Sequence, residues 1–288
     1  MTRPPLLTSA ALALAISTSL AAAAQASPLE SRRPRHLVVI GGGDHPPAAM
    51  ARFVLWAGGV EARLLVVPWA SGEPKESCDS LVDELRALRP ASVECAPGTV
   101  LDAKGRAAPL APLRARECLS LLSQATGVFF TGGDQARVMD VLADRELLEA
   151  MRARYAAGAV FGGTSAGAAI LSPLMITGDG DFTVIDGSKV DTRPGLGLLE
   201  GAIVDQHFVK RQRENRLFGL VLLHPELRGI GVDEGTALLV ADGHLAEVVG
   251  SGPVMQVDAT GPDRLAVTLL RAGQTTDLSR RPRAKTAP

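Results

Sequence analysis

The sequence predicts an α/β fold in which a mostly parallel sheet is flanked by helices. Short apolar segments of strand length alternate with longer segments of helical periodicity from residue 36 to residue 161. This order is typical of parallel sheets with helices on both faces. Three of the apolar segments end in glycine-rich turns, at residues 41–43, 131–135 and 163–167. Sites in such sheets form at the carboxyl ends of the strands, so we expect these turns to border the functional site.

The individual elements follow from local patterns. The expected strands are short and mostly apolar, and they cover residues 36–40, 63–67, 92–95, 127–130 and 158–161. The expected helices carry apolar residues at helical spacing, and they cover residues 47–57, 76–88, 110–124, 136–142 and 145–155. After residue 230 the pattern changes, because segments 236–240 and 245–249 flank the turn Ala241-Asp242-Gly243. This arrangement predicts a C-terminal β-hairpin, and residues 264–270 predict a last strand.

The N-terminal residues have the pattern of a targeting segment. Arg3 precedes the apolar run 6–24, and Ala24-Gln25-Ala26 fits the small-x-small rule for signal cleavage. We expect residues 1–26 to be a signal peptide, against the alternative of an N-terminal membrane anchor. The protein would then be exported to the periplasm or the cell exterior.

Composition restricts the class of protein and its partners. The chain has 30 Lys and Arg against 31 Asp and Glu, a balance that favours neither nucleic-acid binding nor stable membrane association after signal removal. We expect one α/β domain over residues 27–274 and a disordered basic tail over residues 275–288. The spacing of Cys78, Cys95 and Cys118 matches no metal site, so we expect structural cysteines with at most one disulfide, whose partners stay open.

The turn Gly163–Gly167, with the sequence Gly-Thr-Ser-Ala-Gly, is the strongest functional signal. It lies between the apolar segments 158–161 and 168–171, so Ser165 occupies the apex of a strand, a tight turn and a helix. Small neighbours let the backbone turn sharply, and the following helix aims its N–H groups toward the serine. We predict that Ser165 is a nucleophile; the alternative is an ordinary glycine-serine turn.

A nucleophilic serine needs a base and an acid that orients the base. His207 follows the apolar stretch 198–204 and lies at an expected strand-to-helix edge. The segment 229–235 reads as a short strand that ends in Asp233 and Glu234. Either acid could reach the histidine.

The order of these residues along the chain separates two classes of hydrolase. An α/β-hydrolase runs serine, acid, histidine, whereas the best candidates here run Ser165, His207, Glu234. The α/β-hydrolase order would need poorer contexts, with the acid drawn from Asp205 or Asp233 and the histidine from His224 or His244. His45 follows the first glycine turn and is a further candidate to line the site.

These segments together resemble the cyanophycinase family, the serine exopeptidases that include the aspartyl dipeptidases. Four segments carry the resemblance in the family's order, namely residues 129–135, 163–168, 205–216 and 229–238. A weaker match at residues 39–43 extends it to most of the mature chain. The sequence Asp-Gln-His-Phe followed by three spaced arginines is particular to the cyanophycinase-like members.

The resemblance implies a class I glutamine-amidotransferase-like, or flavodoxin-like, sheet. It implies that Ser165 is the nucleophile, His207 the base and Glu234 the orienting acid. It also implies a substrate pocket shaped by Gln135, Asp205, Gln206, Arg211, Arg213 and Arg216. The loop at residues 41–47 departs from the family's glycine-glycine-acid pattern, and export departs from the cytosolic enzyme.

The resemblance also implies a substrate, because this family cleaves β-aspartyl bonds. Cyanophycinase releases β-Asp-Arg dipeptides from cyanophycin, a polyaspartate that carries arginine on each side-chain carboxyl. Arginine binds carboxylate in a bidentate manner, while Asp and Gln can hold a guanidinium. In a helix Arg211 would lie about 200° from Arg213. The three arginines could then not all face one pocket, and at least one should pair with a structural acid.

We therefore expect a secreted serine exopeptidase that cleaves isopeptide bonds at β-aspartyl residues, in aspartyl peptides or cyanophycin, through an acyl-enzyme. The oxyanion would be held by the N–H groups of Ala166 and of Gly132 or Gly133. No metal and no cofactor are expected, since the glycines at residues 41–43 lack the full dinucleotide-binding spacing. Alternatives are a dipeptidase acting on short aspartyl or isoaspartyl peptides and a non-catalytic binding protein with the same fold. A homodimer is compatible with the sequence.

Overall fold

The structure is a computed structural model that describes Met1 and residues 34–280. It divides the chain into two units, residues 1–32 and residues 33–288, and the helices and strands belong to the second. The predicted signal peptide, apart from Met1, lies outside the described residues. Across the part of the chain that is described, no helix has both the length and the hydropathy needed to cross a membrane.

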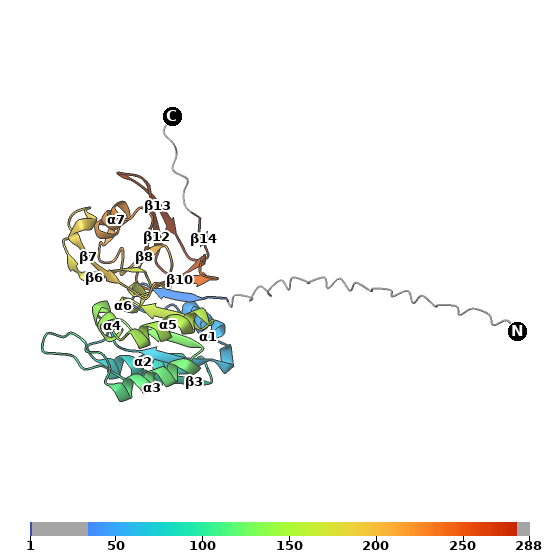
Figure 1. The fold of residues 1–288 in the computed structure, drawn as a ribbon. Coiled ribbons are helices and arrows are strands. Elements are labelled where there is room, and N and C mark those ends of the chain that lie inside the picture. Colours follow the sequence, from blue (N-terminus) through green and yellow to red (C-terminus); the bar gives the residue numbers. More distant parts are fainter. Residues whose placement is uncertain (2–33, 281–288) are drawn as a thin grey trace. The chain divides into compact units, whose positions relative to one another are not determined.

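An eight-stranded sheet with the order β14-β11-β10-β1-β5-β4-β2-β3 lies at the centre of the domain (Figure 1). Its parallel half consists of β1 (Leu37–Ile40), β5 (Val160–Thr164), β4 (Gly127–Phe130), β2 (Arg63–Val67) and β3 (Ser92–Cys95). The antiparallel half consists of β10 (Thr236–Ala241), β11 (Leu245–Gly250) and β14 (Thr275–Asp277). The predicted α/β class and the predicted β10–β11 hairpin are confirmed.

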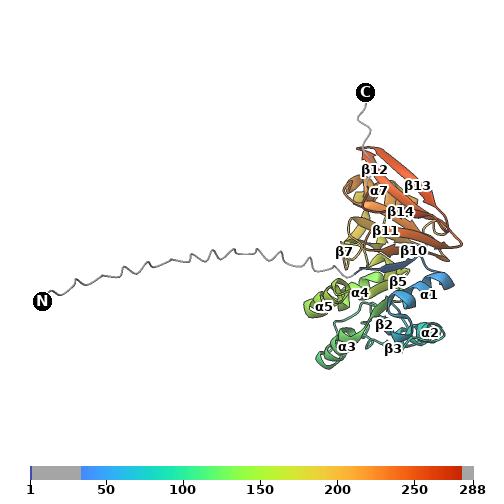
Figure 2. The ribbon, with the colours of Figure 1, turned by 90° about the vertical axis from the view of Figure 1, so that its right-hand side faces the viewer.

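Helices cover both faces of the parallel half, which explains why its central strands are apolar throughout. On one face lie α1 (Pro47–Trp56) and α2 (Pro74–Arg86), and the opposite face carries α3 (Pro112–Gln124), α4 (Gln135–Val141) and α5 (Arg145–Ala156) (Figure 2). The first three helices begin with proline, which is favoured where no N–H partner is needed. Asp134 and Asp144 cap the other two by accepting backbone N–H bonds.

The chain between β5 and β10, together with the later strands β12 and β13, builds a second layer with its own small core. A four-stranded sheet has the order β13-β12-β9-β8 and consists of β13 (Arg264–Leu270), β12 (Val254–Gly261), β9 (Arg228–Val232) and β8 (Ala202–Gln206). Beside it lie α7 (Glu214–Leu223) and the antiparallel ribbon β6 (Leu174–Gly180) and β7 (Val190–Pro194). The short helical segments are α6 (Ala166–Ala169), η1 (Gly59–Glu61) and η2 (Gly187–Lys189).

The predicted boundary between domain and tail is wrong, because ordered structure continues past residue 274. Residues 275–277 form β14 and pair with β11. The buried Arg228 side chain donates hydrogen bonds to the backbone oxygens of Leu278, at 3.0 Å, and of Arg280. A three-residue strand carries too little periodicity to be recognised in the sequence, and only its pairing and this arginine define it.

One disulfide joins Cys78 of α2 to Cys95 of β3. The third cysteine, Cys118, is a buried free thiol, and burial raises its pKa to about 12. This agrees with the expectation of at most one disulfide, and the structure assigns its partners.

Candidate active site

The turn after β5 holds Ser165 in a conformation that few residues adopt. Its φ of 53° and ψ of −115° lie outside the regions favoured by L-residues. A side chain on Gly163 would collide with the backbone of Gly167, and a side chain on Gly167 would collide with the backbone of Phe130. Both glycines are therefore needed for this turn to pack, which agrees with the predicted strand, turn and helix around the serine.

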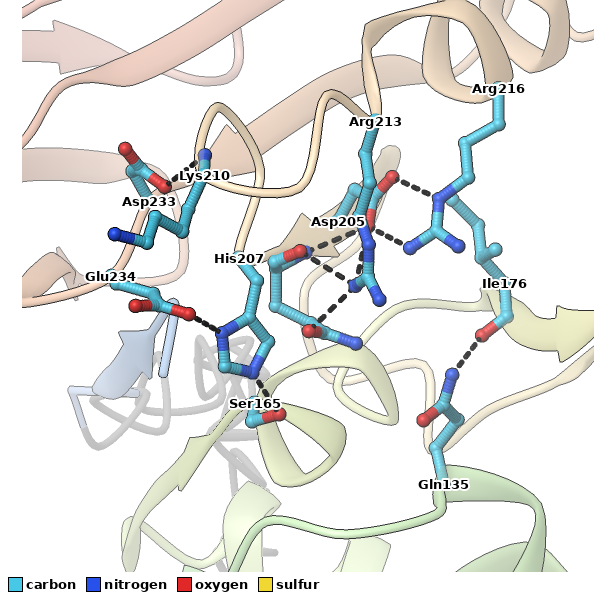
Figure 3. A network of polar contacts seen from close by, with 11 residues as sticks. Gln135, Ser165, Ile176, Asp205, His207, Lys210, Arg213, Arg216, Asp233 and Glu234 are labelled. Carbon is cyan, nitrogen blue, oxygen red and sulfur yellow. Dashed lines mark hydrogen bonds and ion pairs between the residues drawn. The ribbon is translucent and has the colours of Figure 1, made fainter. Parts of the chain in front are cut away.

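Three side chains form a hydrogen-bonded chain where β5 of the large sheet and β8 and β9 of the four-stranded sheet end (Figure 3). Ser165 Oγ lies 2.7 Å from His207 Nε2, and His207 Nδ1 lies 2.6 Å from Glu234 Oε1. The carboxylate accepts the Nδ1–H bond, which leaves Nε2 free to accept the serine proton. The structure thus brings together the three residues that the sequence analysis singled out from segments far apart in the chain.

The first glycine turn supports the histidine and the acid. The N–H of His207 donates to the oxygen of Gly41 at 2.7 Å, and the N–H of Gly235 donates to the oxygen of Gly42 at 2.9 Å. A Cβ added to Gly42 would lie within 3.0 Å of the His207 ring. The turn at residues 41–43 therefore packs directly against the imidazole ring. Because this loop departs from the family pattern, the sequence did not predict this role.

The electrostatic environment favours a neutral imidazole beside an ionised carboxylate. Burial lowers the pKa of His207 below its ordinary value of 6.5, the hydrogen bond to Glu234 opposes this shift, and the charges of Arg211 and Arg213 add to it. The hydrogen bond from His207 is the main cause that lowers the pKa of the Glu234 carboxyl. A neutral imidazole is the form that can accept a proton.

A cavity of about 340 Å³, here called the arginine cavity, opens beside Ser165. Five of the six predicted pocket residues line it, namely Gln135, Gln206, Arg211, Arg213 and Arg216. The sequence analysis missed the other polar residues of its wall, which are Asp134, Thr177, Asp179, Asp191 and Arg193. Most of these belong to the β6–β7 ribbon, which was not predicted. The alternation of glycine and aspartate at residues 178–181 is the signal that could have drawn attention to it.

Asp205 does not line the arginine cavity, and this corrects its expected place in the substrate pocket. Its carboxylate is 1% exposed and accepts two bonds from the Arg216 guanidinium, of which the Nε–Oδ2 bond is 2.6 Å long. The predicted pairing of one arginine with a structural acid is therefore found at Arg216. Asp205 holds this arginine in place at the cavity wall and is not exposed to a ligand.

The remaining predicted pocket residues differ in whether their side chains already have hydrogen-bond partners. Arg213 donates to both the backbone oxygen and Oε1 of Gln206 at 2.8 Å. Burial, the largest cause, lowers the pKa of Arg213 to about 10, which still leaves it charged at neutral pH. Arg211 is exposed and, within the described residues, its side chain has no hydrogen bond or ion pair. Gln135 is buried and donates through Nε2 to the oxygen of Ile176 at 2.8 Å.

The turn at residues 131–133 lies against the serine. A Cβ built on Gly132 would be 3.3 Å from the Ser165 Cβ. Gly133 has φ +135°, and a side chain there would collide with the backbone of Ala70. In residues 34–280 the N–H groups of Ala166 and Gly133 have no backbone acceptor, so both remain available to a ligand beside Ser165.

The other histidines lie outside this hydrogen-bonded chain. His45 contacts Glu84 at 2.7 Å, His224 contacts Glu226 at 3.5 Å, and the ring of His36 stacks on Trp56. His244 contacts the backbone oxygen of Asp242. None of these contacts supports the alternative order along the chain, in which an α/β-hydrolase has its serine first, then its acid and then its histidine. Among the described residues no group of three or more His, Cys, Asp or Glu side chains could hold a metal ion.

Fold and site together define a hydrolase with a flavodoxin-like α/β fold, in which a serine, a histidine and a carboxylate meet at the strand ends. Comparison with known families agrees with this class. The profile described as Peptidase family S51 matches residues 37–248. The chain belongs to this family and is a serine-type peptidase.

Individual relatives confirm the resemblance to the cyanophycinases. The cyanophycinase of Geminocystis herdmanii is 36% identical over 226 residues, which cover 77% of this chain and 80% of the relative. That of Trichormus variabilis is 37% identical over 245 residues, 82% of this chain and 79% of the relative. Peptidase E of Salmonella gallinarum is 29% identical over 148 residues, 49% of this chain and 60% of the relative.

A solved structure shares the fold. The crystal structure of a peptidase from an acI-B1 Actinobacterium superimposes with a TM-score of 0.59 at 20% sequence identity, over 85% of this chain and 98% of that one. This likeness agrees with the predicted fold.

Proposed function

We propose that this chain is an exported exopeptidase that hydrolyses cyanophycin to β-Asp-Arg dipeptides through an acyl-enzyme. One observation carries the proposal. The hydrogen-bonded chain Ser165–His207–Glu234 opens on a cavity lined by both arginine and aspartate side chains. The substrate named for the cyanophycinase relatives has the same mixture of carboxylate and guanidinium groups.

The proposed mechanism assigns a role to each of the three hydrogen-bonded side chains. His207 Nε2 accepts the Ser165 hydroxyl proton as Oγ attacks the carbonyl carbon, and Glu234 stabilises the imidazolium that forms. The N–H groups of Ala166 and Gly133 hold the oxyanion. His207 then gives its proton to the departing amine nitrogen. Water, deprotonated by the same imidazole, attacks the acyl-enzyme and releases the new carboxylate.

The arginine cavity suits a ligand with both charges. Arg211 and Arg213 can bind substrate carboxylate, while the carboxylates of Asp179 and Asp191 can accept hydrogen bonds from substrate guanidinium. The β-Asp-Arg product keeps the amide between the aspartate side chain and arginine. Release of this product therefore breaks the neighbouring main-chain amide, and this replaces the expected cleavage at an isopeptide bond.

Incubation of the mature protein with purified cyanophycin, followed by mass analysis, tests this proposal. We expect β-Asp-Arg to accumulate. Ser165→Ala should lower the hydrolysis rate by a factor of roughly 10⁴ to 10⁶, because it removes the nucleophile. A matched circular dichroism spectrum and melting temperature would show that the variant is folded. Wild-type activity in the variant would overturn the serine mechanism.

A second candidate is hydrolysis of short aspartyl or isoaspartyl peptides. The partial match to Peptidase E favours it. Steady-state rates on β-Asp dipeptides and on the polymer separate the two functions. If neither substrate were hydrolysed, the alternative of a non-catalytic binding protein would replace both.

Export is supported by the sequence of residues 1–26 and by the Cys78–Cys95 disulfide. Disulfides persist in oxidising compartments and are rare in the cytosol. Fractionation of cells expressing the full chain, with N-terminal sequencing of the product, tests this part. We expect a mature N-terminus near Ser27; retention of Met1 in the cytosol would contradict it.

A further inference from the structure

A second cavity lies on the other side of the catalytic turns. It measures about 380 Å³ and is here called the α2 cavity. The strand ends contribute Thr131, Gly132 and Thr164 to its wall. The remaining wall consists of His45 and Leu81 together with the polar α2 residues Glu76, Ser77, Ser80 and Glu84.

The two cavities share the turns that carry the site. Gly132 and Thr164 line the α2 cavity, and the next residue of each turn, Gly133 and Ser165, lines the arginine cavity. A Cβ built on Gly132 would be 3.8 Å from Ser165 Oγ. A peptide bound across Ser165 therefore has one cavity on each side of the bond that is attacked.

The two cavities differ in charge. The arginine cavity has four arginine and three aspartate side chains in its wall. The described residues that line the α2 cavity include two carboxylates, Glu76 and Glu84, and no lysine or arginine. Glu84 contacts His45 through one oxygen, Oε2, at 2.7 Å. Its other oxygen has no hydrogen bond within the described residues.

Two buried hydroxyl groups in the same wall also lack partners. Thr131 is 5% exposed and Thr164 is 8% exposed, and in the described part of the chain neither Oγ1 has a hydrogen-bond partner. Side chains alternate along strands, and Phe129, two residues before Thr131, packs in the core on the α1–α2 face. Thr131 thus projects toward α2. Buried polar groups without partners are uncommon in folded proteins, and here they point to a ligand.

We propose that the α2 cavity is a subsite for a guanidinium group of the substrate, on the side of the scissile bond opposite the arginine cavity. This inference rests on the proposed function. A guanidinium presents five N–H donors in a plane and needs several acceptors. The carboxylates of Glu76 and Glu84 and the hydroxyl oxygens of Thr131 and Thr164 supply them. Because every unit of the polymer carries one arginine, units on both sides of the bond can be held at once.

The test compares two enzymes on matched oligomers. The substrates are the two-unit oligomer of β-Asp-Arg and two analogues in which one or the other arginine is replaced by citrulline, its neutral isostere. The variant is Glu76→Gln with Glu84→Gln, which removes both charges and keeps an acceptor for His45. The control is Asp83→Asn, an equal change on an exposed residue of α2 outside the cavity.

We expect the double variant to lower kcat/KM for the all-arginine oligomer by about tenfold or more, since it weakens charge-assisted hydrogen bonds. Asp83→Asn should change it less than twofold. One of the two analogues lacks the guanidinium that would bind in the α2 cavity. On that analogue, wild type and double variant should have equal kcat/KM, because the substrate charge with which the two glutamates interact is already absent. Calorimetric binding of the same oligomers to Ser165→Ala should show the same pattern.

The outcomes separate this inference from the proposed function. Two results would overturn the subsite alone, provided that wild type hydrolyses the oligomer. The first is an unchanged rate in the double variant, and the second is an equal loss of rate on all three substrates. Wild type that hydrolyses neither oligomer nor polymer would overturn the proposed function and the subsite with it.

Discussion

The proposed nucleophile and its proposed base both have a positive backbone φ angle. Ser165 has φ 53° and His207 has φ 48°. Such conformations cost about 1–3 kcal/mol each in non-glycine residues and persist where surrounding structure enforces them. Here the N–H of Ser165 donates to Ile40 O and that of His207 to Gly41 O, so neighbouring residues of one strand end hold both. These two hydrogen bonds anchor the backbones of the residues whose Oγ and Nε2 atoms lie 2.7 Å apart.

In the proposed mechanism, the pKa of His207 sets the acidic limit of activity, because the imidazole must be neutral to accept the serine proton. Burial, together with nearby arginine charge, lowers the pKa of His207 below 6.5. The acidic limb of the kcat/KM profile should therefore have its midpoint below pH 6.5. Arg211→Ala removes a positive charge, so the pKa should rise and the midpoint should move to higher pH.

Two controls accompany this pH profile. Arg211→Lys keeps the charge and should keep the wild-type midpoint even if substrate binding weakens. Lys210→Ala changes an adjacent cation that affects Glu234 rather than His207. An Arg211→Ala profile that superimposes on wild type after scaling would contradict the assignment.

At the scale of elements, one buried ion pair joins the strand before His207 to the helix after it. Asp205 ends β8 beside Gln206, and Arg216 lies in the first turn of α7. The guanidinium of Arg216 also lies 4.8 Å from the ring of Phe182 at the β6–β7 ribbon. This pair therefore connects three elements that surround the arginine cavity.

Asp205→Ala should lower the free energy of unfolding by about 3–5 kcal/mol, because it leaves the buried Arg216 charge uncompensated. Urea unfolding followed by circular dichroism measures the loss. Replacing both partners, as Asp205→Leu with Arg216→Met, should recover much of the stability since no buried charge remains. A loss below about 1 kcal/mol in the single variant would show that the pair contributes little.

At the scale of the whole molecule, the parallel half of the sheet ends at β3, which within residues 34–280 pairs with β2 alone. The Cys78–Cys95 disulfide ties this edge strand to α2 across a sequence separation of 17 residues. The same helix provides the acidic wall of the α2 cavity, so the bridge also steadies that wall.

Replacing Cys78 and Cys95 by serine should cost about 3 kcal/mol, the expected effect of opening a loop of this length. Guanidinium unfolding measures the change. Wild type unfolded in a reducing agent should match the variant, while the variant itself should not respond to the reductant. Equal stability of oxidised and reduced wild type would contradict a structural role for the bridge.

An element of this fold could be predicted where its own sequence carries a clear local pattern. The strands of the parallel half and the helices around it have local apolar periodicity, and Ser165 has local turn chemistry, so all were found in the sequence. The strands β6, β7, β12 and β14 were not, because their pairing is with distant segments and their own patterns are short or mixed. The part of the arginine-cavity wall that β6 and β7 contribute was missed with them.

The sequence by itself determined the α/β class, the three residues of the hydrogen-bonded chain and the family, because these depend on local patterns and their order. Only the tertiary structure decided that Asp205 forms a buried ion pair with Arg216, that residues 41–43 pack against the imidazole, and that a second, acidic cavity borders Ser165. These features arise from contacts between residues far apart in the chain, and local periodicity carries no information about which distant side chains meet.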